Sequence, residues 1–311
     1  MTKLIFGMLV FFAADASAGE YPLLETIRQE SIGGMVSSLT GGEPAPSAVS
    51  EEPPAEEKYF NSYVLKAVDF LYANYGLLGY DIHSVLTHDI EYYVYGVIAA
   101  TRPPLTMCVA AQMEIILTAY RIYAQETGDY SVYSYLPKKS FEGLSVKDLK
   151  GHIWVNHEFN SYGTADALVN FGMGELTGFD KLKPGSFVNI NRTTGTGHAV
   201  AFIGYINRVG EIQPAYNPDV IGFKYFSSQG GAAAGEGGFD YRYAVFKDFG
   251  CPEMPYKRDC NVIYSANRKM LNTGSMLHPK FWIHPAQEPE ASTLKDTVFD
   301  GKFFDGRTTD D

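Results

Sequence analysis

Cys108 and His198 are two residues whose types and surroundings could support cleavage of an amide bond. Cys108 follows Pro103-Pro104-Leu105-Thr106 and stands where a long helix is predicted to begin. The unpaired N–H groups and partial positive charge of a helix N-terminus favour thiolate, the nucleophilic form of cysteine. His198 follows two glycines and precedes an apolar run, so it lies at the entrance of a predicted strand and could accept the thiol proton. The alternative interpretations are a buried structural cysteine and a hydrogen-bonded core histidine.

A third polar group could come from the run between Tyr225 and Gly231. Strand alternation places Tyr225, Ser227 and Gln229 on one face. If this strand pairs with the strand of His198, a polar side chain at its end could orient the imidazole. The alternative is a simple turn sequence that leads into Gly230-Gly231.

Two further segments of the sequence resemble motifs of a known enzyme family. The segment from Leu182 to Val188, Leu-Lys-Pro-Gly-Ser-Phe-Val, resembles the strand entry of the NlpC-type cell-wall cysteine amidases and endopeptidases and of their CHAP-domain relatives. The Gly-His-hydrophobic run from Gly197 to Gly204 resembles the strand that follows in those proteins. The resemblance covers roughly residues 92–246. Two features depart from it: Ser186 replaces the usual Asp, and Cys108 lacks the common Asp-Cys-Ser context.

The resemblance implies a papain-like α+β domain in which Cys108 is the nucleophile and His198 the general base. It places the third residue at Ser227 or Gln229, with Ser228 less suitable by side-chain direction. It also implies hydrolysis of peptidoglycan amide bonds through an acyl-thioester, without a cofactor or metal.

Two other functions remain open. One is a papain-like protease or a transglutaminase-like acyltransferase acting on proteins, with Asp219 as a possible third residue. The other is a non-catalytic papain-fold module that binds the cell wall or a partner through its aromatic surface. One tyrosine among Tyr92, Tyr93 and Tyr95 could donate a hydrogen bond to the oxyanion.

The elements that must position these residues change type along the chain. Helices are predicted from Tyr59 to near Gly76, over Asp89 to Ala100, from about Met107 to Gln125 with Thr106 as cap and Gly128 as end, and around Thr164 to Gly172. Strands are predicted over Ser186 to Ile190, Ala199 to Ile206, Gly222 to Ser227 and Tyr241 to Phe246. Helices followed by strands predict an α+β domain with helices packed on an antiparallel sheet.

The N-terminus predicts export. A basic start, the apolar run Leu4 to Ala14 and the small residues Ala16-Ser17-Ala18 are typical of a signal peptide over residues 1–18. We expect a flexible acidic, Pro- and Gly-rich arm over 19–58, the hydrolase domain over 59–285 and an acidic, loosely ordered tail over 286–311. The mature protein would be periplasmic or secreted, without a membrane span.

The net charge limits the classes of binding partner, and the cysteine positions predict one disulfide. The 311 residues carry 25 basic and 36 acidic side chains, a net charge of −11, which argues against long-range attraction to nucleic acid or anionic lipid. The expected partner is peptidoglycan or a peptide; the sequence does not indicate an oligomeric state. Cys251 and Cys260 are predicted to form a disulfide that leaves out Cys108.

Neither a metal nor a nucleotide site is predicted. His83 and His88, like His152 and His157, are five residues apart and so fall on different faces of a helix or strand. The segment from Gly230 to Gly238 lacks the Gly-Lys-Ser/Thr ending of a P-loop, and we interpret it as a loop beside the site.

Overall fold

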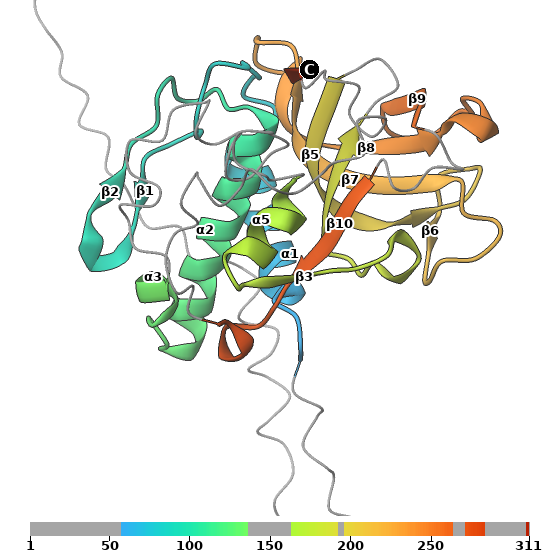
Figure 1. Ribbon diagram of the computed structural model, residues 1–311. Coiled ribbons are helices and arrows are strands. Elements are labelled where there is room, and N and C mark those ends of the chain that lie inside the picture. The colour runs from blue at the N-terminus through green and yellow to red at the C-terminus, as the bar shows by residue number, and fades with distance from the viewer. Residues whose placement is uncertain (1–56, 136–162, 192–195, 264–270, 284–308, 311) are drawn as a thin grey trace, which may run out of the picture. The chain divides into compact units, whose positions relative to one another are not determined.

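The computed structural model describes residues 57–135, 163–191, 196–263, 271–283 and 309–310 (Figure 1). The predicted signal peptide, nearly all of the predicted arm and most of the predicted tail lie outside these residues, as do His152 and His157. In the described part of the chain, no helix is long and apolar enough to cross a membrane.

Four α-helices are described: α1 (Asn61–Tyr75), α2 (Cys108–Thr127), α3 (Val132–Tyr135) and α5 (Thr164–Asn170). Three of them lie where the sequence predicts helices. Gly128 ends α2 as predicted, because it adopts the left-handed backbone, φ 76°, that glycine tolerates best. The residue before α2 differs from the prediction: Met107, not Thr106, is the N-cap, and no side chain caps the helix. Thr106 lies one residue too early because its backbone forms a β-bridge with Tyr80.

The predicted helix over Asp89 to Ala100 is wrong. This segment forms a short hairpin of β1 (Ile90–Glu91) and β2 (Val97–Ile98) around the 3-10 turn η1 (Tyr93–Tyr95), drawn beside α2 in Figure 1. Gly96 has φ 104°, and Tyr92 N donates to Gly96 O at 2.7 Å, which turns the chain back on itself. The aromatic and β-branched residues of this run suit a hairpin as well as a helix.

A nine-stranded sheet forms the other layer, in the order β3-β10-β4-β5-β7-β8-β9, with β6 and β11 paired to β5. The strands are β3 (Gly174–Leu176), β4 (Phe187–Asn191), β5 (Thr196–Ile206), β6 (Ile212–Gln213), β7 (Gly222–Gly230), β8 (Gly237–Phe246), β9 (Arg258–Ile263), β10 (Leu271–Met276) and β11 (Thr309–Asp310). Pairing is antiparallel except between β8 and β9 and between β11 and β5. The remaining short 3-10 turns are η3 (Phe179–Lys181), η4 (Lys247–Phe249) and η6 (Pro279–Phe281).

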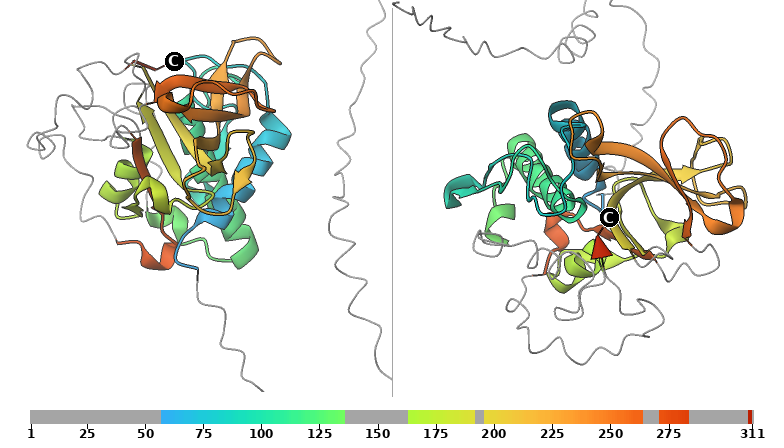
Figure 2. Two further views of the ribbon diagram at one scale, coloured as in Figure 1. Left: turned by 90° about the vertical axis from the view of Figure 1, so that its right-hand side faces the viewer. Right: turned by 90° about the horizontal axis from the view of Figure 1, so that it is seen from above.

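The predicted α+β architecture is therefore confirmed at the level of helices packed on a largely antiparallel sheet. All four predicted strands are present, as β4, β5, β7 and β8. Strands β5, β7 and β8 are the long ones, with 11, 9 and 10 residues, and Figure 2 shows that the sheet is strongly curved. Strands β3, β6, β9, β10 and β11 were not predicted.

Alternation along β5 separates two apolar clusters. Ala199 and Ala201 belong to the cluster that includes α1 and α2, whereas Val200 and Phe202 belong to a second cluster. Successive side chains of a strand point to opposite faces, so these clusters lie on the two faces of the sheet. The small alanines on the helix side leave room for α2 to approach the strand closely.

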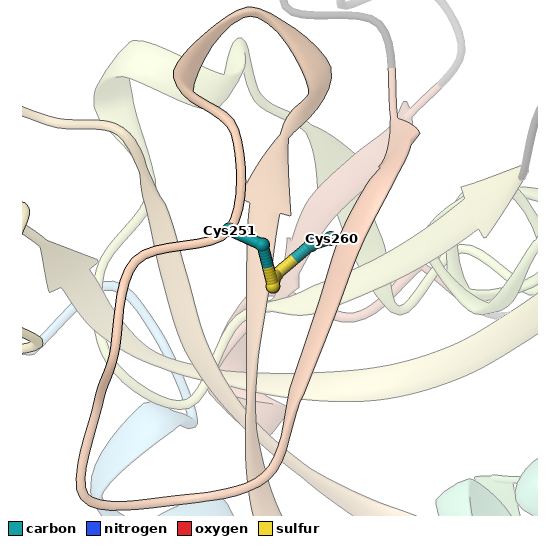
Figure 3. Close-up of a disulfide and its surroundings, with 2 residues drawn as sticks. All are labelled: Cys251 and Cys260. Atoms are coloured by element: carbon teal, nitrogen blue, oxygen red, sulfur yellow. A yellow bond between two sulfur atoms is a disulfide. The ribbon is translucent and has the colours of Figure 1, made fainter.

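The predicted disulfide between Cys251 and Cys260 is present, with Cα atoms 5.2 Å apart (Figure 3). It joins the loop after η4 to β9. Cys108 is buried and takes no part in a disulfide.

Candidate active site

Cys108 is the first residue of α2 and is fully buried. The helix has 20 residues, so its dipole is well developed, and no acidic side chain occupies its first turn. Met107 is the N-cap residue, and no side chain forms a capping hydrogen bond with the backbone N–H groups of this first turn. Both features favour the thiolate form of Cys108, whereas its burial in an apolar cluster opposes ionisation.

His198 and Gln229 form the clearest contact between predicted site residues. His198 Nε2 lies 2.7 Å from Gln229 Oε1, and both side chains are buried. Gln229 Nε2 donates to the carbonyl oxygen of Asp240 at 3.2 Å, which turns the amide oxygen toward the imidazole. An amide oxygen can only accept, so the proton of the neutral imidazole lies on Nε2. The lone pair, and therefore the basic atom, is Nδ1.

Strand geometry and a ring contact position the imidazole. His198 lies opposite Ile190 in the β4–β5 pairing, and its ring centroid is 5.6 Å from that of Tyr225 in a T-shaped arrangement. Alternation places His198 on the same face of β5 as Val200, whereas Ala199 faces the helices, on the side of the cluster that contains Cys108. A proton transfer between Cys108 and His198 would therefore have to pass around the end of β5, where His198 is the third residue. The imidazole is thus held between its amide partner and an aromatic ring.

The serine candidates have other roles. Ser227 Oγ donates to the carbonyl of Ala199 at 2.6 Å, and Ser228 Oγ donates to the carbonyl of Thr106 at 2.9 Å. Of the two predicted third residues, Gln229 is therefore the one that hydrogen-bonds His198. Ser227 and Ser228 instead tie β7 to its neighbour strand and to the segment before α2.

Gln112 is a site residue that sequence reasoning missed. This buried side chain lies one turn after Cys108, and its Nε2 donates to Cys108 O at 3.3 Å and to Ala199 O at 3.0 Å. It also lies 3.4 Å from Ser227 Oγ. One amide thus joins the first turn of α2 to the residue after His198 and to the strand of Gln229. A polar residue four positions after a cysteine, in an otherwise apolar helical run, was the only sequence signal.

Other candidates lie elsewhere. Asp219 is exposed in the loop before β7, whereas Gln229 lies near the far end of that strand, roughly 20 Å away at the usual rise per residue. Asp219 is therefore not the third residue.

Tyr92 packs on Tyr133, which also contacts Tyr120, in the C-terminal half of α2.

The predicted oxyanion donors lie with that aromatic cluster. Tyr93 stacks on Tyr130, with ring centroids 4.6 Å apart. Tyr120 lies about 18 Å along the helix axis from Cys108. The hairpin tyrosines thus adjoin the end of α2 that is remote from the cysteine, and the backbone N–H groups at the start of α2 are the better oxyanion donors.

Among the residues that the structure describes, no three His, Cys, Asp or Glu side chains are grouped so that they could hold a metal ion.

No family model matches the chain, and neither a curated protein nor a solved structure matches it. The resemblance to the NlpC-type and CHAP-domain enzymes thus rests on the Pro-Gly and Gly-His motifs and on the upstream cysteine that begins a helix, and the pairing of Cys108 with His198 stays a prediction.

Proposed function

We propose that this protein is an exported cysteine amidase or endopeptidase that hydrolyses peptidoglycan amide bonds through an acyl-enzyme on Cys108. The hydrogen bond between His198 and Gln229 carries this proposal, because it sets the imidazole in the tautomer that a base acting through Nδ1 requires. Gln112 adds support, because it connects the cysteine's helix to both strands of this pair.

The reaction follows from the roles of these groups. His198 Nδ1 accepts the proton of Cys108, and the thiolate sulfur adds to the amide carbonyl carbon. Backbone N–H groups at the start of α2 stabilise the oxyanion. His198 then gives its proton to the leaving amine as the C–N bond breaks, which leaves a thioester. A water molecule deprotonated by His198 attacks the thioester, releases the acid and restores the thiol.

Gln229 supports the charged stage of this cycle. When Nδ1 is protonated, the imidazolium still donates from Nε2 to Gln229 Oε1, and this hydrogen bond strengthens with the charge. The amide does not titrate, so it orients the ring without competing for the proton.

The compartment and the substrate rest on separate support. Disulfides persist mainly in oxidising compartments, so the Cys251–Cys260 bridge favours an exported protein, in agreement with the signal-like N-terminus. The motif resemblance supports a cell-wall substrate.

The test uses protein starting at Gly19 and its Cys108→Ala variant, each incubated with purified peptidoglycan. We expect the parent protein alone to release soluble fragments, and their masses identify the cleaved bond. The alkylation rate of Cys108 by iodoacetamide at neutral pH provides a second readout, because a low-pKa thiol alkylates quickly. If no peptidoglycan is hydrolysed but Cys108 alkylates rapidly, the substrate would instead be a protein, and cleavage of casein would test this. Silence with a slow thiol would exclude the catalytic proposal.

A further inference from the structure

Arg242 carries a positive charge that the described part of the chain does not pair. It lies on β8 and is partly buried. Its Nε is enclosed without a hydrogen-bond partner, and no carboxylate of the described residues forms an ion pair with it. Guanidinium groups remain charged at all relevant pH values, so a partly buried one without a partner is unfavourable in the unliganded protein.

The guanidinium lies beside the His198–Gln229 pair. Arg242 is directly opposite Tyr225 in the β7–β8 pairing, and Tyr225 is the ring that contacts His198. At its other end, Arg242 Nη2 lies 3.0 Å from where a Cβ on Gly230 would stand. Gly230 directly follows Gln229, so Arg242 lies opposite one residue that contacts His198 and reaches the residue after the other.

Gly230 keeps this space open. Its φ of 97° lies in the region that favours glycine, and any larger side chain would also press on the guanidinium. The guanidinium of Arg242 therefore lies against Gly230, where β7 turns into β8.

The nearby acids do not neutralise this charge. Asp240 uses Oδ1 to accept from the backbone of Tyr241 and uses its carbonyl to accept from Gln229. Glu236, in the turn between β7 and β8, is exposed, and neither carboxylate lies within ion-pair distance of Arg242 in the described structure. A planar guanidinium that presents its outer nitrogens suits a carboxylate, which it can hold through two parallel hydrogen bonds.

We propose that Arg242 forms a carboxylate-binding subsite next to His198 and Gln229, so that the substrate is a peptide with a free carboxylate close to the cleaved amide. This subsite deepens the proposed function and rests on it for the position of the cleaved bond. Carboxylate recognition itself needs only Arg242 and its surroundings.

The kinetic test compares soluble muropeptides before and after their carboxylates are converted to amides. We expect the parent protein to lose tenfold or more in kcat/KM on the amidated substrates, which is the usual scale for a charge-assisted pair. Arg242→Gln should show the same loss on the carboxylate substrates, mainly through KM, and little further loss on the amides. Arg208→Gln, an exposed arginine beyond the far end of β5, is the matched control.

A binding test separates the subsite from the proposed function. The Cys108→Ala protein is titrated with N-acetylglycine and, as the uncharged control, with N-acetylglycinamide, while the guanidinium NMR signal of Arg242 is followed. A saturable shift with the acid alone supports the subsite even if peptidoglycan is not hydrolysed. Arg242→Lys should retain part of the binding, and circular dichroism confirms that the variants fold.

Two results would overturn the subsite. One is peptidoglycan hydrolysis in which parent and Arg242→Gln proteins treat carboxylate and amide substrates alike. The other is an Arg242 signal that responds equally to the acid and the amide. The first would leave the cysteine amidase intact and remove only its carboxylate recognition.

Discussion

His198 lies on a strand and His88 lies in a loop, and these two elements pack on opposite sides of α2. The two histidines contact polar side chains of different kinds. His198 contacts the neutral amide of Gln229. His88 lies 2.9 Å from the hydroxyl of Thr87 and 3.8 Å from the carboxyl of Glu114, and its ring stacks on Tyr75 at 4.1 Å. Gln112 and Glu114 are two residues apart on α2, which places them on nearly opposite sides of the helix.

The difference shows what a candidate base requires of its partner. Gln229 sets the tautomer of His198 and does not titrate. Glu114 is fully buried, and burial raises the pKa of its carboxyl from 4.5 to about 7, although the hydrogen bonds from Thr87 oppose this shift. Burial, with the charge of Arg121, lowers the pKa of His88. Glu114 therefore makes the stability of the protein depend on pH. The neutral amide of Gln229, in contrast, leaves His198 free to transfer a proton.

The largest expected effect is the contrast between the two histidines in catalysis. His198→Ala should lower kcat/KM on peptidoglycan roughly 10²- to 10⁴-fold, because the proposed general base is lost. His88→Ala should change it less than about tenfold, because that ring lies on the other side of the helix. Release of soluble fragments measures both variants. A similar loss in both would break the comparison.

Glu114→Gln tests the pH dependence of stability. The pKa of Glu114 is higher in the folded protein than the ordinary 4.5, so its contribution is fully present below pH 4.5 and is lost as the pH rises to about 7. Between those limits the parent protein should lose roughly 3 kcal/mol relative to Glu114→Gln. Urea unfolding across this pH range measures the difference, with Glu126→Gln, an exposed residue on the same helix, as control. Parallel curves for parent and Glu114→Gln would contradict the prediction.

Substitutions at Gln229 test whether the neutral amide partner of His198 matters for catalysis. Gln229→Ala should reduce kcat/KM roughly tenfold to a hundredfold, the scale of one hydrogen bond to a charged group. Gln229→Glu gives His198 a carboxylate neighbour, which raises the imidazole pKa and moves the acid limb of the pH–rate profile to higher pH. A profile unchanged in Gln229→Glu would show that this side chain does not act on the base.

The smallest effect is expected at Gln112. Gln112→Met removes the donor to Ala199 O, but that carbonyl keeps the hydrogen bond from Ser227. We expect a loss of about 1 kcal/mol in unfolding free energy, typical of one buried hydrogen bond, and a several-fold fall in kcat/KM. Gln112→Glu, tested by the same unfolding and kinetic measurements, should be worse, because it places an acceptor against two carbonyl oxygens. Equal stability of Gln112→Glu and the parent protein would remove Gln112 as a link.

Sequence patterns identified the parts of the fold that depend on local signals. Apolar periodicity and Gly128 located α2, and alternation located β5 and β7. The hairpin at Asp89 to Ala100 was missed, because a short Tyr-rich apolar run does not distinguish helix from hairpin. Gln112 and Arg242 were missed for another reason: their partners or neighbours lie far away in the sequence, and only the folded strands bring them together.

The place of β10 in the sheet has a consequence for the order of folding. This late strand lies between β3 and β4, and β3 has no other strand partner in the described sheet. Until residue 276 has been synthesised, β3 cannot pair and β4 keeps one open edge. The nascent chain therefore remains without its complete sheet for most of translation, and β3 and β4 stay open to other pairing until the late strand joins them.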